Sequence, residues 1–291
     1  MDRRLDSSDG VSLAYHSYPS SVSDPVEAHP PAFLFSHANG FHGRCFDPVA
    51  THLAPQPCFT FDYRGHGDSS VPPDWEVRWS AYGDDALVAA RATATSGPVI
   101  GAGHSMGAAG LIMAALREPS LFAALVLYEP IVFPASFRHR GTNPMAAAAR
   151  RRRASFDSLD DAYANYASKP PLNSFHADCL RAYVDHGFRA TADGRVELKC
   201  SPELEARNFE SGNVHDTWDR LGKLSVPIWL VSGLIGDMPP ASLVPSIAAA
   251  IAETSTITPT VIEWKDLGHF GPLEDPARFA ALLREVRETV Q

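Results

Sequence analysis

A serine held between two glycines is the feature of this sequence with the clearest chemical meaning. The segment Gly103-His104-Ser105-Met106-Gly107 follows an apolar run at 98–102 and opens a run of small residues typical of a helix. A tight strand-to-helix turn lifts a serine oxygen clear of the backbone, and a Cβ at either flanking position would collide with neighbouring main chain. The pattern therefore predicts that Ser105 is a nucleophile.

The same turn predicts a way to stabilise negative charge. Met106 would be the first residue of the helix, so its backbone N–H would point to the place where charge develops on a substrate carbonyl oxygen. Nucleotide-binding patterns do not fit, because a dinucleotide fingerprint would need glycine at position 106 and the chain has no G-K-[ST] for a P-loop.

A serine nucleophile needs a base within hydrogen-bond reach, and His269 is the best candidate. It lies in Leu267-Gly268-His269-Phe270-Gly271-Pro272, in a loop after the last predicted strand, Thr260–Trp264. Other histidines, namely His37, His42, His52 and His66, lack metal-ligand spacings such as H-E-x-x-H. We expect no metal and no organic cofactor.

The base in turn needs a carboxylate that orients it and stabilises the imidazolium, and two residues qualify. Asp237 follows the predicted strand Ile228–Ser232, in Gly233-Leu234-Ile235-Gly236-Asp237. Glu129 ends the preceding strand, in Leu127-Tyr128-Glu129-Pro130, 24 residues after Ser105. The residues alone leave both open.

Apolar β-rich runs alternate with helical patterns along most of the chain, which predicts an α/β fold with a mostly parallel, doubly wound sheet. The stretch 134–211 interrupts this alternation. It is richer in charge, with two helical patterns and one weak strand signal at 195–200. We expect residues 1–133 and 212–291 to form the core and residues 134–211 to form a mainly helical, mobile cap that controls the choice of substrate.

Four segments together resemble the α/β-hydrolase superfamily: Ser36-His37-Ala38-Asn39-Gly40, Asp62-Tyr63-Arg64-Gly65-His66-Gly67-Asp68-Ser69, the serine turn, and Gly268-His269-Phe270 followed by Leu273-Glu274-Asp275-Pro276. The resemblance covers both ends of the chain and implies the α/β-hydrolase fold with a cap inserted after strand 6. It also implies that Asn39 supplies the second oxyanion donor beside Met106. Where members of the superfamily usually have a His-Gly pair in this loop, this chain has His37-Ala38.

The spacing of Glu129 from the serine is similar to that in haloalkane dehalogenases, zearalenone lactonases and a group of fungal acyl-CoA hydrolases, which take their acid from this earlier strand. By that resemblance we favour Glu129 over Asp237. Serine rather than aspartate at position 105 excludes dehalogenase and epoxide-hydrolase chemistry, which needs a carboxylate nucleophile.

Composition limits the partners. The formal net charge of −9 disfavours nonspecific binding to nucleic acid or to an anionic membrane, so a small molecule is the expected partner. No stretch approaches the ~20 apolar residues of a membrane span, and the charged N-terminus resembles no signal peptide. We expect a cytoplasmic protein whose four cysteines are reduced; nothing in the sequence fixes its oligomeric state.

The run Arg150-Arg151-Arg152-Arg153 in the predicted cap fits either a contact with an anionic substrate tail or, by preference, a solvated helix face. The expected activity is hydrolysis of a small-molecule ester, lactone or thioester through an acyl-enzyme. Hydrolysis of C–C bonds, acyl transfer and cofactor-free perhydrolysis use the same residues and stay open, as does a non-catalytic small-molecule receptor.

Overall fold

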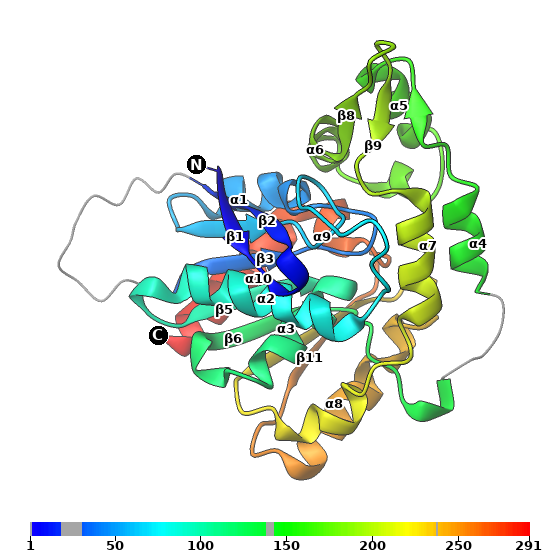
Figure 1. The fold of residues 1–291 in the computed structure, drawn as a ribbon. Helices are drawn as coiled ribbons and strands as arrows, with labels where there is room; N and C mark the ends of the chain where they lie inside the picture. Colours follow the sequence, from blue (N-terminus) through cyan, green and yellow to red (C-terminus); the bar gives the residue numbers. More distant parts are fainter. Residues whose placement is uncertain (1, 19–30, 138–142, 237) are drawn as a thin grey trace.

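The computed structural model describes residues 2–18, 31–137, 143–236 and 238–291. An eight-stranded sheet in the order β1-β2-β4-β3-β5-β6-β10-β11 forms its centre (Figure 1). The strands are β1 (Asp2–Asp6), β2 (Ser12–Ser17), β3 (Phe33–Ser36), β4 (Cys58–Phe61), β5 (Val99–His104), β6 (Phe122–Tyr128), β10 (Ile228–Gly233) and β11 (Thr260–Trp264). Strands β1 and β2 pair antiparallel at one edge, and the strands from β4 to β11 run parallel. The predicted fold class is confirmed.

Helices cover both faces of this sheet. They are α1 (Asp47–Leu53), α2 (Trp79–Thr93), α3 (Met106–Ala115), α8 (Val244–Thr254), α9 (Gly271–Glu274) and α10 (Pro276–Val290). Residues of α2, α3 and α8 belong to one hydrophobic cluster, and residues of α1 and α10 belong to another. The core is therefore a sheet between two helical layers.

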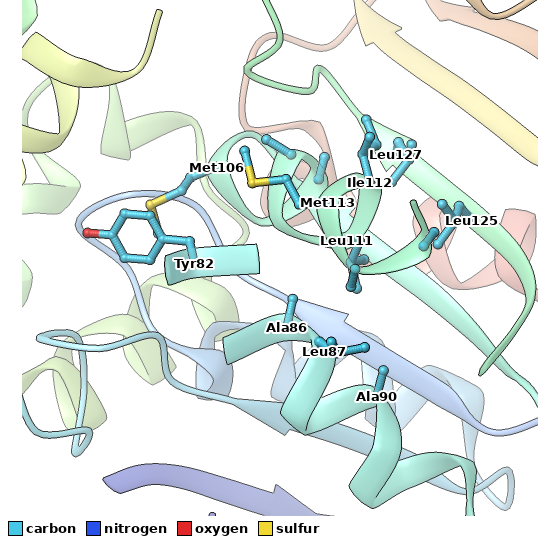
Figure 2. Close-up of a cluster of buried hydrophobic side chains, with 14 of the residues drawn as sticks. Tyr82, Ala86, Leu87, Ala90, Met106, Leu111, Ile112, Met113, Leu125 and Leu127 are labelled. Carbon is cyan, nitrogen blue, oxygen red and sulfur yellow. The ribbon is translucent and has the colours of Figure 1, made fainter. Parts of the chain in front are cut away.

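Strand β6 shows why the sequence gives this arrangement. Leu125 and Leu127 belong to the cluster with α2 and α3, whereas Val126 and Tyr128 belong to the cluster with α10. Side chains alternate between the faces of a strand, so a strand that is apolar at every position is buried on both sides. Figure 2 shows Leu125 and Leu127 with Leu111 and Ile112 of α3 in the first cluster.

The region predicted as a cap contains more strand than the sequence indicated. Its elements are α4 (Pro144–Arg150), β7 (Ser155–Phe156), α5 (Leu159–Ala167), α6 (Ala177–Gly187), β8 (Phe188–Ala190), β9 (Val196–Leu198) and α7 (Pro202–Ser211). The three strands form an antiparallel sheet in the order β7-β9-β8. Of these strands, only β9 had a sequence signal, at 195–200. The alternation of apolar and polar residues that marks a strand cannot be recognised over the two residues of β7 or the three of β8.

Two parts of this region attach to the core differently. Cys179, Leu180 and Tyr183 of α6 share a buried cluster with Phe41 and Phe46 of the core. Helices α4 and α7 lie side by side (Figure 1) and form a separate small cluster of alanines with Phe209. Little apolar surface is therefore buried between the two helices, and α7 reaches the core through Leu204, which belongs to the cluster with α2 and α3.

Within the ranges given above, no helix combines the length and the apolar composition that crossing a membrane requires.

Candidate active site

The turn around Ser105 has the strained geometry that its glycines predict. Ser105 has φ 56° and ψ −115°, a region that residues other than glycine rarely adopt. A Cβ on Gly103 would lie 2.6 Å from the Cα of Ala108, and a Cβ on Gly107 would lie 2.1 Å from the carbonyl oxygen of Ser36. Neither site has room for a side chain, so both glycines are required for the turn between β5 and α3.

The close approach at Gly107 also brings the loop after β3 to the serine turn. The Ser36 hydroxyl donates to the Gly107 carbonyl at 3.1 Å. In the same loop, His37 Nε2 accepts the Tyr63 backbone N–H at 2.9 Å, and its Nδ1 lies 2.8 Å from the Ala38 carbonyl. Burial lowers the pKa of His37 to about 3, so it stays neutral and braces the loop.

Glu129 holds the predicted base. His269 Nδ1 lies 2.5 Å from Glu129 Oε2. A carboxylate only accepts hydrogen bonds, so Nδ1 carries the proton and donates it, which leaves Nε2 with the lone pair. His269 is therefore in the tautomer that a general base requires.

The carboxylate of Glu129 is itself fixed by the sheet. The backbone N–H of Glu129 donates to the Val231 carbonyl at 2.9 Å. The second carboxylate oxygen, Oε1, accepts the Gly233 N–H at 2.8 Å. Glu129 has φ 45° and is only 1% exposed. Both oxygens have partners, as a buried carboxylate requires.

Two residues that the sequence analysis missed position the loop that carries His269. His104 Nε2 donates to the His269 carbonyl at 2.7 Å, and the Tyr128 hydroxyl donates to the Gly268 carbonyl at 2.6 Å. Burial keeps the pKa of His104 well below its usual value, so it is a neutral donor. The sequence marks these two residues only by their position, since His104 directly precedes Ser105 and Tyr128 directly precedes Glu129.

Five of the predicted site residues line one cavity of about 840 Å³: Asn39, Ser105, Met106, Glu129 and His269. Much of the remaining wall is apolar and comes from residues both inside and outside the stretch 134–211, with Trp79, Ile131, Phe133, Phe137, Met145, Phe209, Ile235, Met238 and Phe270. The volume fits a small organic molecule, and the wall favours an apolar one.

The other candidates have different surroundings. Asp237, the alternative acid, lies outside the described residues. In the arginine run, Arg150 makes exposed ion pairs with Glu203 and Glu210, whereas the Arg152 side chain is only 16% exposed and pairs with Glu205 at 2.7 Å. The expectation of a solvated face is therefore wrong for Arg152, because its partner lies on α7, far away in the sequence.

No cluster of three or more histidine, cysteine, aspartate or glutamate side chains that could hold a metal ion occurs in the described part of the chain. The reactive side chains that meet in the cavity are a serine, a histidine and a carboxylate.

The model of the family described as "Alpha/beta hydrolase family" matches residues 33–282. The chain belongs to the alpha/beta hydrolase family. A curated relative, lipase LipV of Mycobacterium tuberculosis, is 35% identical over 103 residues, which are 35% of this chain and 38% of that protein. The chain thus matches well under half of that lipase.

A second curated relative matches a larger part of this alpha/beta hydrolase. The 2-(acetamidomethylene)succinate hydrolase of Mesorhizobium japonicum is 27% identical over 234 residues, which are 79% of this chain and 77% of that protein. The crystal structure of an E-2-(acetamidomethylene)succinate hydrolase superposes with a TM-score of 0.76 at 20% identity and covers 99% of both chains. At that identity the structural likeness shows the fold.

Proposed function

We propose that this alpha/beta hydrolase is a serine hydrolase that cleaves a small-molecule ester, thioester or lactone. The proposal rests on one observation above all: Glu129 Oε2 lies 2.5 Å from His269 Nδ1 in the cavity that Ser105 lines. A buried carboxylate bonded to Nδ1, with Nε2 left for the nucleophile, is the arrangement that activates serine in hydrolases.

In the proposed reaction, Ser105 Oγ attacks the substrate carbonyl carbon while His269 Nε2 takes the hydroxyl proton. The backbone N–H groups of Met106 and Asn39 stabilise the oxyanion, and His269 then protonates the leaving oxygen or sulfur as the C–O or C–S bond breaks. Water, deprotonated by His269, attacks the acyl-enzyme and releases the acid and free Ser105. Glu129 remains ionised throughout and stabilises the imidazolium.

The cavity supports a substrate with an apolar acyl or alkyl group. Phe133, Phe209 and Phe270 line it, and burying one methylene contributes about 0.8 kcal/mol of binding free energy. Residues 134–211 would act as the cap of this site, because α7 and the segment before α4 supply part of its wall. The lipase among the relatives agrees with ester hydrolysis.

A panel of p-nitrophenyl esters of increasing chain length, acyl-CoA thioesters and lactones tests this proposal. We expect turnover of at least one class and a loss of more than about 10³-fold in kcat for Ser105→Ala. Ser242→Ala is the matched control, since this serine is exposed. Near-wild-type turnover by Ser105→Ala would rule out the mechanism.

The panel also separates the alternatives. A β-diketone cleaved faster than every ester would indicate C–C bond hydrolysis, and transfer to an added alcohol or to peroxide in preference to water would indicate acyl transfer or perhydrolysis. A small-molecule receptor of this fold would turn over none of them. It would also leave Ser105 unlabelled by a fluorophosphonate, because phosphonylation needs the activated serine.

A further inference from the structure

Cap helix α7 contacts the oxyanion loop directly. The Asn39 side chain donates from Nδ2 to the Glu205 carbonyl at 3.0 Å, and its Oδ1 accepts the Asn208 Nδ2 at 2.8 Å. At Gly40, where φ is +79°, a Cβ would lie 2.8 Å from Glu205 Cδ. One face of α7 therefore lies against the loop whose backbone is proposed to bind the oxyanion.

Asn208 is in turn held from the core. Its Oδ1 accepts the hydroxyl of Tyr82 at 2.7 Å, and Tyr82 belongs to α2 and to the buried cluster that contains Met106 (Figure 2). Tyr82, Asn208 and Asn39 are all buried. Hydrogen bonds between buried groups fix orientation, because a group that loses its partner has no second protein partner in the right place.

We propose that Asn208 is a positioning residue for the oxyanion hole: it orients Asn39 so that the Asn39 backbone N–H faces the developing oxyanion. The inference rests on the proposed function. The chain of contacts runs from α2 through Asn208 to Asn39, so the oxyanion hole has its full geometry only when α7 is seated on the core.

The fixed direction of the Asn39 side chain supports this role. Both its Nδ2 and its Oδ1 bond to α7, and His66 Nε2 of the core also lies 3.3 Å from Oδ1, so the side chain joins the loop to the helix and the main chain is left as the donor. Arg152 further fixes this face of α7 through its ion pair at 2.7 Å with Glu205, whose side chain lies against Gly40. Asn208 also lines the cavity, so a loss in kcat would report its positioning role and a rise in KM would report a lost substrate contact.

The experiment compares Asn208→Ala and Asn208→Leu with the wild type on p-nitrophenyl acetate, whose short acyl group needs little of the cap wall. Complete loss of one oxyanion donor costs about 10²–10³-fold in kcat. Misorientation of Asn39 weakens that donor without removing it, so the Asn208 variants should lose about tenfold in kcat while KM changes less than about twofold. Inhibition by phenylboronic acid, whose serine adduct mimics the oxyanion, should weaken by a similar factor.

Ser211→Ala is the matched control. It removes another, partly buried contact between α7 and the core, the hydrogen bond from Trp79 Nε1 to Ser211 Oγ at 3.2 Å. It also removes the bond from Ser211 Oγ to the Arg207 carbonyl but leaves the side-chain hydrogen bonds of Asn39 in place. We expect its kcat on the acetate ester and its boronate inhibition to stay within about twofold of the wild type. An equal loss in Ser211→Ala would mean that any loosening of α7 lowers kcat, which would overturn the specific role of Asn208.

A double variant, Tyr82→Phe with Asn208→Leu, separates positioning from stability. Removing both partners leaves no unsatisfied hydroxyl, so Tm should recover relative to Asn208→Leu alone while kcat stays low. Recovery of kcat together with Tm, or an unchanged kcat in both single variants, would overturn the inference. If the wild type hydrolyses no ester and Ser105 resists a fluorophosphonate, the proposed function fails and the inference fails with it.

Discussion

The serine turn and the α4 and α7 pair line the same cavity, but they are held by different interactions. The turn is fixed by main-chain contacts, since Gly107 touches the Ser36 carbonyl and Gly103 touches the backbone of Ala108. The helix pair is held by side chains, through its small cluster of alanines with Phe209 and through ion pairs of Arg150 and the nearby Arg152 with carboxylates of α7.

This difference determines which part of the site should tolerate amino-acid substitutions. Chemistry needs reacting atoms placed to within a fraction of an ångström, and close-packed main chain gives that accuracy. A substrate wall needs only shape and polarity, which side chains on a cap can supply in many ways. We expect substitutions in the turn to abolish activity, whereas most substitutions in the cap should alter stability or substrate choice.

Glycine-to-alanine substitution in the serine turn and in the turn between β8 and β9 of the cap gives the largest contrast. Gly107→Ala should destabilise the protein by about 3 kcal/mol and abolish hydrolysis, because its Cβ would overlap the Ser36 carbonyl. Gly194→Ala in the cap should cost only about 1 kcal/mol for its positive φ, because nothing lies within 4 Å of the new Cβ. Urea unfolding and kcat on one ester measure both, and similar losses would contradict the contrast.

Acid should destabilise the core through its buried histidines. Burial lowers the pKa of His37 to about 3 and the pKa of His42 and His66 to about 4. Above pH 6.5 these histidines are neutral both folded and unfolded. As the pH falls below 6.5, these histidines become protonated in the unfolded chain but stay neutral in the folded protein. The free energy of unfolding therefore falls by about 1.4 kcal/mol per pH unit for each histidine, until the pH reaches that histidine's pKa in the folded protein.

Urea unfolding from pH 8 to pH 4.5 checks this dependence, and His37→Gln should reduce the slope by about one histidine's share. A slope unchanged by this substitution would show that His37 titrates normally in the folded protein.

Within the cap, burial should decide which ion pair matters. Arg152→Met would leave Glu205 buried without its partner and should cost about 3 kcal/mol, with partial recovery in Arg152→Met/Glu205→Gln. Arg150→Ala removes two exposed ion pairs and should shift Tm by no more than about 1 °C, since solvent screens them. Thermal unfolding followed by circular dichroism compares the variants, and a larger shift for Arg150→Ala would reverse the ranking.

The same contrast explains what the sequence could predict. The turn was predictable because its constraints act between neighbours, two glycines around Ser105 after an apolar strand. The parallel strands followed from continuous apolar runs, whereas β1, Asp2-Arg3-Arg4-Leu5-Asp6, was missed because a charged edge strand has no such run.

Contacts between distant residues could not be predicted in this way. Asn208 and Asn39 are 169 positions apart, and no local pattern marks either as the other's partner. Arg152 could not be told from its neighbours in the arginine run, because its burial depends on where α7 packs. Glu129 and His269 are 140 positions apart, so the sequence left two carboxylates as candidates and only analogy favoured one.

The paired variants Glu129→Gln and Asp237→Asn test whether Glu129, which follows β6, orients the base. Glutamine keeps the shape of Glu129 but removes the charge that stabilises the imidazolium, so kcat should fall by about 10²–10⁴-fold. Asp237→Asn should change kcat less than about fivefold, because His269 Nδ1 already has Glu129 as its partner. A crippled Asp237→Asn beside an active Glu129→Gln would contradict the account.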